Sequence, residues 1–214
     1  MKHGLKKTEV PQCLPGFESI NRFWNKKREC FVAKILPGEL YVSRLDEMIA
    51  TTLGSCVSAC IWDQRYSIGG MNHFMLPLTD IAAPEVSWGN IQSDATRYGN
   101  YAMEYMINEV LKNGGHQSNL QAKVFGGAKI FNRQNDVGAK NAEFVLEYLH
   151  CENIPVISQD LGDTYARRIM FDPKNGKAFM KKIRDIHNSN IVDREINYQH
   201  SIEKSSVEGD IELF

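Results

Sequence analysis

The chain has 214 residues, enough for one domain with a sizeable core and terminal extensions. Its 25 basic and 26 acidic residues nearly cancel, so charge gives no reason to expect nucleic acid or an anionic membrane as partner. No stretch approaches the roughly 20 apolar residues that span a bilayer, and the start lacks the continuous apolar region of a signal peptide. The five cysteines are odd in number and irregularly spaced, which predicts reduced thiols in a soluble, cytoplasmic protein.

The first half of the chain predicts an extension followed by strands. Residues 1–37 mix aromatic and basic side chains with three prolines, and we expect a partly ordered extension there. Short runs rich in Val, Ile, Thr and Tyr then predict strands within 38–44, 48–62 and 67–76. Residues 78–92 show no sustained period and are interpreted as a surface loop.

The second half alternates helices and strands. The clearest helix lies within 93–115, where apolar residues that include Tyr98, Ala102, Tyr105 and Met106 recur every three or four positions and Gly114 can end it. The later predictions are a strand at 120–127, a helix at 138–151, a short buried strand at 154–158 and a hairpin at 167–183 that turns at Pro173–Gly176. This order indicates a layered α/β or α+β domain. Beyond residue 186 the chain is polar, and we expect a mobile tail.

A cysteine and a histidine in the predicted hairpin suggest a catalytic pair. If residues 55–63 and 66–75 pair in antiparallel fashion around a two-residue or four-residue turn, Cys56 lies directly opposite His73. Opposed residues share a face of the sheet, with Cβ atoms roughly 5 Å apart. A neighbouring imidazolium favours the thiolate, and histidine can then return its proton to a leaving group, which suits acyl transfer. Main-chain N–H groups in the turn before the cysteine would stabilise an oxyanion.

Other interpretations of the same residues stay open. The alternation around Cys56 also fits a buried strand whose thiols only pack. Cys60 shares that face and, with Cys56 and His73, gives a weak zinc signal without a CxxC spacing. The segment 125–131, "FGGAKIF", lacks a complete phosphate-loop pattern, and its glycine pair indicates tight turning or close approach of another backbone. We therefore predict neither a metal nor a cofactor.

Five motifs in order resemble the CheD family of chemoreceptor glutamine deamidases. They are "LGSCVSACIWD", "GGMNHFMLP", "FGGAKIF", "VGAKN" and "DLGD", and the resemblance runs from about residue 38 to 184. It implies an α/β fold, a three-layer sandwich with a mixed, largely antiparallel sheet and flanking helices. The chain then divides into an N-terminal extension (1–37), a CheD-like deamidase domain (38–185) and a polar, mobile C-terminal tail (186–214).

The resemblance also implies a hydrolase without a cofactor. Cys56 would be the nucleophile and His73 its acid/base partner, and the substrates would be glutamines of methyl-accepting chemotaxis receptors. The family's third site residue is a threonine: Thr51 fits the T-x-LGSC motif and is our choice, whereas strand alternation favours Thr52, and Ala50 stands where some members have theirs. A CheC-like phosphatase is a further expected partner. Two alternatives are a chemotaxis adaptor in which catalysis is secondary, and a general cysteine peptidase or amidase.

Overall fold

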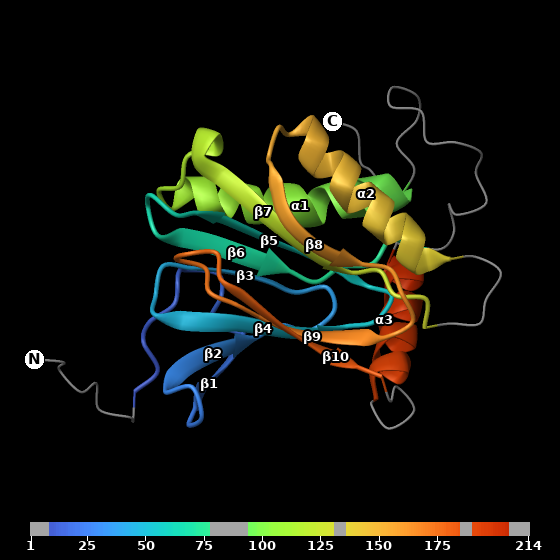
Figure 1. Cartoon of the computed structure of the whole chain (residues 1–214), viewed down its shortest axis with the longest axis horizontal. Helices are drawn as coiled ribbons and strands as arrows, with labels where there is room; N and C mark the ends of the chain where they lie inside the picture. The colour runs from blue at the N-terminus through green and yellow to red at the C-terminus, as the bar shows by residue number, and fades with distance from the viewer. Residues whose placement is uncertain (1–8, 78–93, 131–135, 185–189, 206–214) are drawn as a thin grey trace, which may run out of the picture.

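The computed structural model describes residues 9–77, 94–130, 136–184 and 190–205 (Figure 1). The elements in chain order are β1 (Asn21–Asn25), β2 (Cys30–Lys34), β3 (Leu40–Ser43), β4 (Glu47–Leu53), β5 (Val57–Asp63), β6 (Ile68–Asn72), α1 (Asp94–Lys112), the short 3-10 turn η1 (Gln117–Asn119), β7 (Leu120–Gly126), α2 (Val137–Cys151), β8 (Val156–Leu161), β9 (Ala166–Phe171), β10 (Ala178–Ile183) and α3 (Ile191–Ser205). Within these ranges, no helix has the length and apolar character needed to cross a membrane.

The strands form two five-stranded sheets. The first has the order β1-β2-β4-β9-β10 and the second the order β3-β6-β5-β7-β8. Neighbouring strands are antiparallel except for the parallel pairs β2–β4 and β7–β8. Helices α1 and α2 cover the outer face of the second sheet, giving sheet, sheet and helix layers (Figure 1). The predicted three-layer α/β sandwich is confirmed, although the sequence predicts one mixed, largely antiparallel sheet and the structure has two of this kind.

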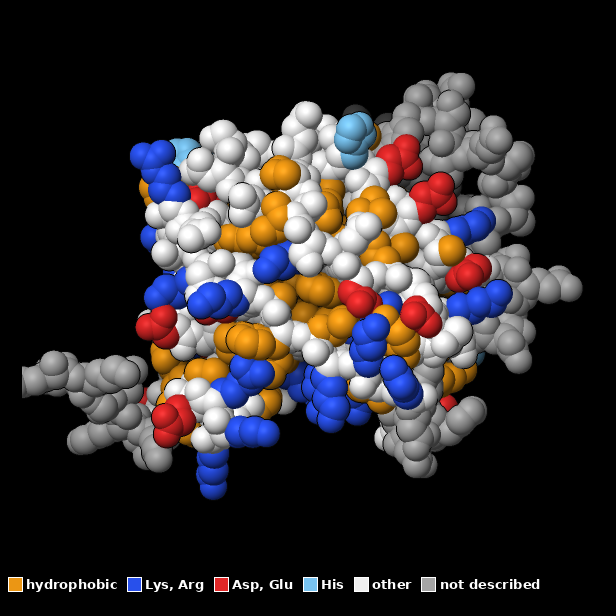
Figure 2. Space-filling view, viewed as in Figure 1, with side chains coloured by type: hydrophobic (Ala, Val, Ile, Leu, Met, Phe, Trp, Pro, Cys, Tyr) orange, Lys and Arg blue, Asp and Glu red, His pale blue; other side chains and the backbone are white. Residues whose placement is uncertain are grey.

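The core lies on both faces of the second sheet. Every residue of β5 is buried, because this central strand packs against the first sheet on one side and the helices on the other. Trp62 of β5 meets Phe171 of β9 across the sheet interface, with ring centroids 5.9 Å apart. On the face shown in Figure 2, acidic and basic side chains are interspersed, in keeping with the small net charge.

Helix α1 follows the predicted period with one correction. It ends before Gly114, whose φ of 101° is the left-handed conformation expected of a helix stop. The buried stripe includes Met103, Met106 and Val110, but Tyr105, expected on this stripe, is 37% exposed. The apolar face is therefore rotated slightly from the predicted one. The predicted loop at 78–92 lies outside the described residues.

The predicted register of the β5–β6 hairpin is wrong. Asp63 pairs with Ile68, so Cys56 is not directly opposite His73. The cause is the turn: the Asp63 carboxylate accepts hydrogen bonds from the N–H groups of Arg65 (2.9 Å) and Tyr66 (3.2 Å), and the four residues 64–67 form the connection. This local bonding moves the pairing by two positions.

Both terminal extensions contribute to the described structure. In the N-terminal extension, β1 and β2 form a hairpin that joins the first sheet beside β4. The sequence predicts a mobile tail beyond residue 186. This prediction is wrong for residues 191–205, which form helix α3. Ile191, Glu195, Gln199 and Ile202 are spaced by four, four and three residues, and all are buried on one face of this helix. The domain boundaries drawn from the sequence remain predictions.

Candidate active site

Cys56 lies in a three-residue crossing between the two sheets. Strand β4 belongs to the first sheet and β5 to the second, and residues 54–56 connect them. The carbonyl oxygens of residues 54, 55 and 56 accept hydrogen bonds, in that order, from the N–H of Ala128 (2.8 Å), the side-chain amide of Asn141 (2.9 Å) and the N–H of Gly127 (2.8 Å). This bonding fixes the orientation of the crossing.

The glycine pair of the "FGGAKIF" segment supports the same crossing. Gly126 has a φ of 113°, and a Cβ built on it would lie 2.1 Å from the carbonyl oxygen of Cys56. Only glycine allows this approach. The interpretation of the pair as a place where two backbones come close is confirmed.

The N–H groups of the crossing converge on one carboxylate. Glu195 of α3 accepts hydrogen bonds from the N–H groups of Gly54 (2.7 Å), Ser55 (2.8 Å) and Cys56 (3.4 Å), and from the Ser55 hydroxyl (2.6 Å). Three successive main-chain donors aimed at one point form an anion-binding nest. Such a nest can also stabilise an oxyanion that develops beside the Cys56 sulfur.

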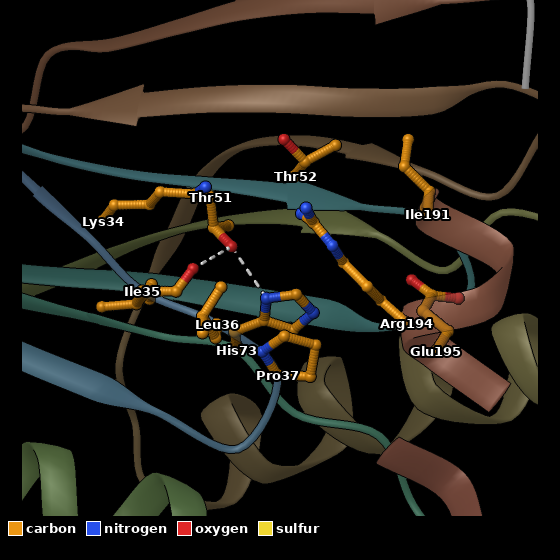
Figure 3. Close-up of a pocket in the computed structure, with 10 residues that line it drawn as sticks. All are labelled: Lys34, Ile35, Leu36, Pro37, Thr51, Thr52, His73, Ile191, Arg194 and Glu195. Atoms are coloured by element: carbon orange, nitrogen blue, oxygen red, sulfur yellow. Dashed lines mark hydrogen bonds between the residues drawn. The ribbon is translucent and has the colours of Figure 1, made fainter. Parts of the chain in front are cut away.

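His73 follows the end of β6 and is held by its own backbone and by Thr51. Its N–H donates to the carbonyl of Glu39 (2.9 Å), and its carbonyl accepts from the N–H of Gly38 (2.8 Å). Its ring nitrogen Nδ1 lies 2.7 Å from the hydroxyl oxygen of Thr51 (Figure 3). Thr52 lines the same pocket, but the hydroxyl that meets the ring is that of Thr51.

The Thr51 contact sets the tautomer of His73. The Thr51 hydroxyl also lies 2.9 Å from the carbonyl oxygen of Ile35, which only accepts hydrogen bonds. The hydroxyl therefore donates to Ile35 and accepts from Nδ1–H of His73. Nε2 is left with its lone pair, and it is buried without a partner among the described residues. An unprotonated ring nitrogen in this position can act as a general base.

Cys56 and His73 meet although they are not directly opposed. Val57 pairs with Phe74, so Cys56 and His73 are offset by two positions and remain on the same face. The Cys56 sulfur, a His73 ring nitrogen and a Glu195 carboxylate oxygen all lie within 4.8 Å of one another. The structure thus brings together Cys56, His73 and Thr51, and adds Glu195.

Burial keeps the pair neutral in this arrangement. Cys56 is 0% and His73 2% exposed. Burial raises the pKa of the Cys56 thiol well above its usual value, and the charge and hydrogen bond of Glu195 raise it further. Burial lowers the pKa of His73 to about 3. The site as described therefore holds a thiol and a neutral imidazole.

The side chains present do not favour a metal. A carboxylate offers about four acceptor positions, and the four hydrogen bonds to Glu195 use them. Nδ1 of His73 is bonded to Thr51. Cys60, considered as a zinc ligand from the sequence, is buried in β5 and is not part of the group formed by Cys56, His73 and Glu195.

Glu195 is the site residue that the sequence did not reveal. It lies 139 residues after Cys56, in a segment predicted to be mobile. The spacing of Ile191, Tyr198 and Ile202 is a helical signal that would have predicted α3. Nothing in the local sequence marks Glu195 as a partner of Cys56.

Comparison with known proteins places this chain in a family. The family model described as "CheD chemotactic sensory transduction" matches residues 75–182. A protein of Halorhodospira halophila named "Probable chemoreceptor glutamine deamidase CheD" is 49% identical over 205 residues, covering 96% of this chain and 94% of its own. A protein of Hahella chejuensis with the same name is 46% identical over 215 residues, covering 100% of both chains. Because these likenesses extend over nearly the whole length, the chain belongs to the CheD family.

Proposed function

We propose that this protein is a cytoplasmic hydrolase that converts specific glutamines of methyl-accepting chemotaxis receptors to glutamate. The names of its relatives supply the substrate class. The observation that supports the chemistry is the position of Cys56, whose sulfur lies beside a neutral His73 at the nest of N–H groups from residues 54–56. A thiol, a base and oxyanion donors at one point are what amide hydrolysis through a thioester requires.

The first half of the reaction releases ammonia. His73 Nε2 takes the Cys56 thiol proton as the sulfur attacks the side-chain carbonyl carbon of the glutamine. The oxygen becomes an oxyanion that the N–H groups of residues 54–56 stabilise. His73 then gives its proton to the amide nitrogen, the C–N bond breaks, and ammonia leaves behind a thioester on Cys56.

The second half restores the enzyme. His73 Nε2 takes a proton from water, the hydroxide adds to the thioester carbon, and the C–S bond breaks. The sulfur regains a proton, and the product is a glutamate side chain. Thr51 keeps Nδ1 protonated throughout, so that Nε2 is the nitrogen that exchanges protons in both halves.

The matched test replaces two buried cysteines one at a time. With a receptor cytoplasmic fragment as substrate, Cys56→Ala should abolish ammonia release and the Gln-to-Glu conversion seen by peptide mass mapping. Cys60→Ala should keep the activity, because Cys60 lies in β5 outside the group of reacting side chains. Full activity of Cys56→Ala would contradict the proposal.

Cys56→Ala also tests whether the protein acts mainly as an enzyme or as an adaptor. If Cys56→Ala restores receptor-dependent chemotaxis as well as the wild type does, binding rather than deamidation is the main task. A CheC-like phosphatase as a further partner remains a prediction of the family resemblance.

A further inference from the structure

Helix α3 closes the site in which the reaction would take place. Cys56 and His73 are buried, and a carboxylate oxygen of Glu195 on α3 lies within 4.8 Å of the Cys56 sulfur and of a His73 ring nitrogen. A glutamine of another protein cannot reach the Cys56 sulfur while the Glu195 side chain fills this space. Substrate binding therefore requires α3 to leave.

Glu195 has the chemical form of the reaction product. Deamidation would leave a carboxylate on a helical side chain, with its oxygens beside the nest of residues 54–56. Glu195 is a carboxylate on a helix, and its oxygens accept hydrogen bonds from that nest at 2.7 to 3.4 Å. The arrangement matches an enzyme–product complex formed within one chain.

Apart from Glu195, α3 is held through the same buried face, which also carries Ile191, Gln199 and Ile202. Ile191 and Ile202 are buried near its two ends, and the Tyr198 hydroxyl bonds to that of Tyr98 on α1. In the described part of the chain, α1 and α2 pack along the second sheet, whereas α3 has no comparable partner among the strands and helices. A helix held mainly through one face and one carboxylate can be exchanged for another helix that offers the same groups.

We propose that the surface beneath α3 is the docking site of the receptor helix, and that α3 is a tethered competitor whose Glu195 occupies the subsite of the substrate glutamine. This rests on the proposed function, because it takes the receptor glutamine as the natural occupant. The partner is thus an amphipathic helix that projects one glutamine into the nest.

The proposal makes α3 a substrate when Glu195 is changed to glutamine. In Glu195→Gln the carboxamide carbon of residue 195 stands beside the Cys56 sulfur. The sulfur attacks this carbon, ammonia leaves with the His73 proton, and water hydrolyses the thioester, so that one glutamine and one water give one glutamate and one ammonia. The variant should therefore convert itself back to the wild-type sequence.

Self-conversion can be measured on the full chain without any receptor. Glu195→Gln is purified and incubated, and the peptide 193–209 is fragmented to determine the residue at position 195. We expect glutamate at position 195 and release of one ammonia per chain. Gln199, one helical turn further, stays a glutamine and serves as the internal reference.

Two control variants exclude spontaneous deamidation. Cys56→Ala combined with Glu195→Gln should keep glutamine at position 195, because the nucleophile is gone. Asn197→Gln places a glutamine on the exposed face of α3 and should also remain unconverted. Conversion in either control, or no conversion in Glu195→Gln, would overturn the proposal.

The receptor fragment distinguishes failure of this proposal from failure of the proposed function. If wild-type protein deamidates the fragment but Glu195→Gln does not convert itself, the function stands and the role of α3 is overturned. With the fragment as substrate, Glu195→Ala should lower KM severalfold and leave kcat unchanged. A tethered competitor occupies the site in a fraction of the molecules, and the apparent affinity for the substrate falls in proportion to the fraction that stays open. A reduced kcat or an unchanged KM would count against α3 as a competitor.

Discussion

At the scale of single residues, Thr51 decides which nitrogen of His73 exchanges protons. Its hydroxyl donates to the Ile35 carbonyl and can only accept from Nδ1–H, so Nε2 is the basic nitrogen. Thr51 is thus a positioning residue that acts through His73. Thr52 is half-buried at the pocket wall and does not have this contact.

Replacing each threonine tests this assignment. Thr51→Val removes the acceptor for Nδ1–H, and we expect kcat for the receptor fragment to fall by roughly 10- to 100-fold, part of what a positioned acid–base group contributes. Thr51→Ser keeps the hydroxyl and should recover most of the activity, whereas Thr52→Val should have little effect. A larger loss in Thr52→Val than in Thr51→Val would reverse the assignment.

At the scale of elements, the site depends on how α3 is anchored. Ile202 is 4% exposed near the end of the helix, and Glu195 reaches the nest near its start. The Cys56 thiol is shielded by this helix, and burial together with Glu195 raises its pKa. The accessibility of the thiol therefore reports whether α3 is docked.

Weakening the apolar anchor should expose Cys56. Ile202→Asp removes an apolar side chain whose burial is worth about 1.5–3 kcal/mol, so we expect alkylation of Cys56 by iodoacetamide to become roughly 10- to 100-fold faster. The exposed Cys151 gives the reference rate within each sample. Asn197→Asp adds the same charge on the exposed face and should leave the Cys56 rate unchanged. Equal rates of Cys56 alkylation in the wild type and in Ile202→Asp would show that α3 does not control access to the Cys56 thiol.

At the scale of the whole molecule, the site is assembled where the two sheets meet. Thr51 comes from the first sheet, Cys56 from the crossing, His73 from the end of a strand in the second, and Glu195 from α3. His73 is 2% exposed among these elements, and this burial lowers its pKa to about 3. The buried neutral imidazole links the stability of the fold to pH.

The direction in which the free energy of unfolding changes with pH can be measured. The unfolded chain binds a proton on His73 below about pH 6.5, while the folded chain does not until about pH 3. Stability is therefore complete above pH 6.5 and falls by about 1.4 kcal/mol per pH unit as the pH drops towards 3. Between pH 7 and pH 5, urea unfolding of the wild type should show a loss about 2 kcal/mol larger than that of His73→Gln.

Another histidine provides the control for this measurement. His116 is exposed and stacks on Tyr66, so His116→Gln should keep the pH dependence of the wild type. Equal pH dependence in His73→Gln and the wild type would mean that His73 is not buried as a neutral ring.

The sequence by itself determined the helices and strands between residues 38 and 184 and the meeting of Cys56 with His73, but not β1, β2 or α3. Helix periods and strand alternation are local, and a register error of two positions leaves side chains on the same face, so the wrong hairpin pairing still gave the right pair. The register itself was decided by the hydrogen bonds of Asp63 within the turn.

Only the tertiary structure decided the choice between Thr51 and Thr52 and the presence of Glu195. Alternation along a strand predicts Thr52, but it applies only within one sheet, and the chain passes from the first sheet to the second between β4 and β5. Glu195 reaches the nest from a helix 139 residues further along the chain. Contacts of this range depend on how sheets and helices pack, which no local pattern of residues encodes.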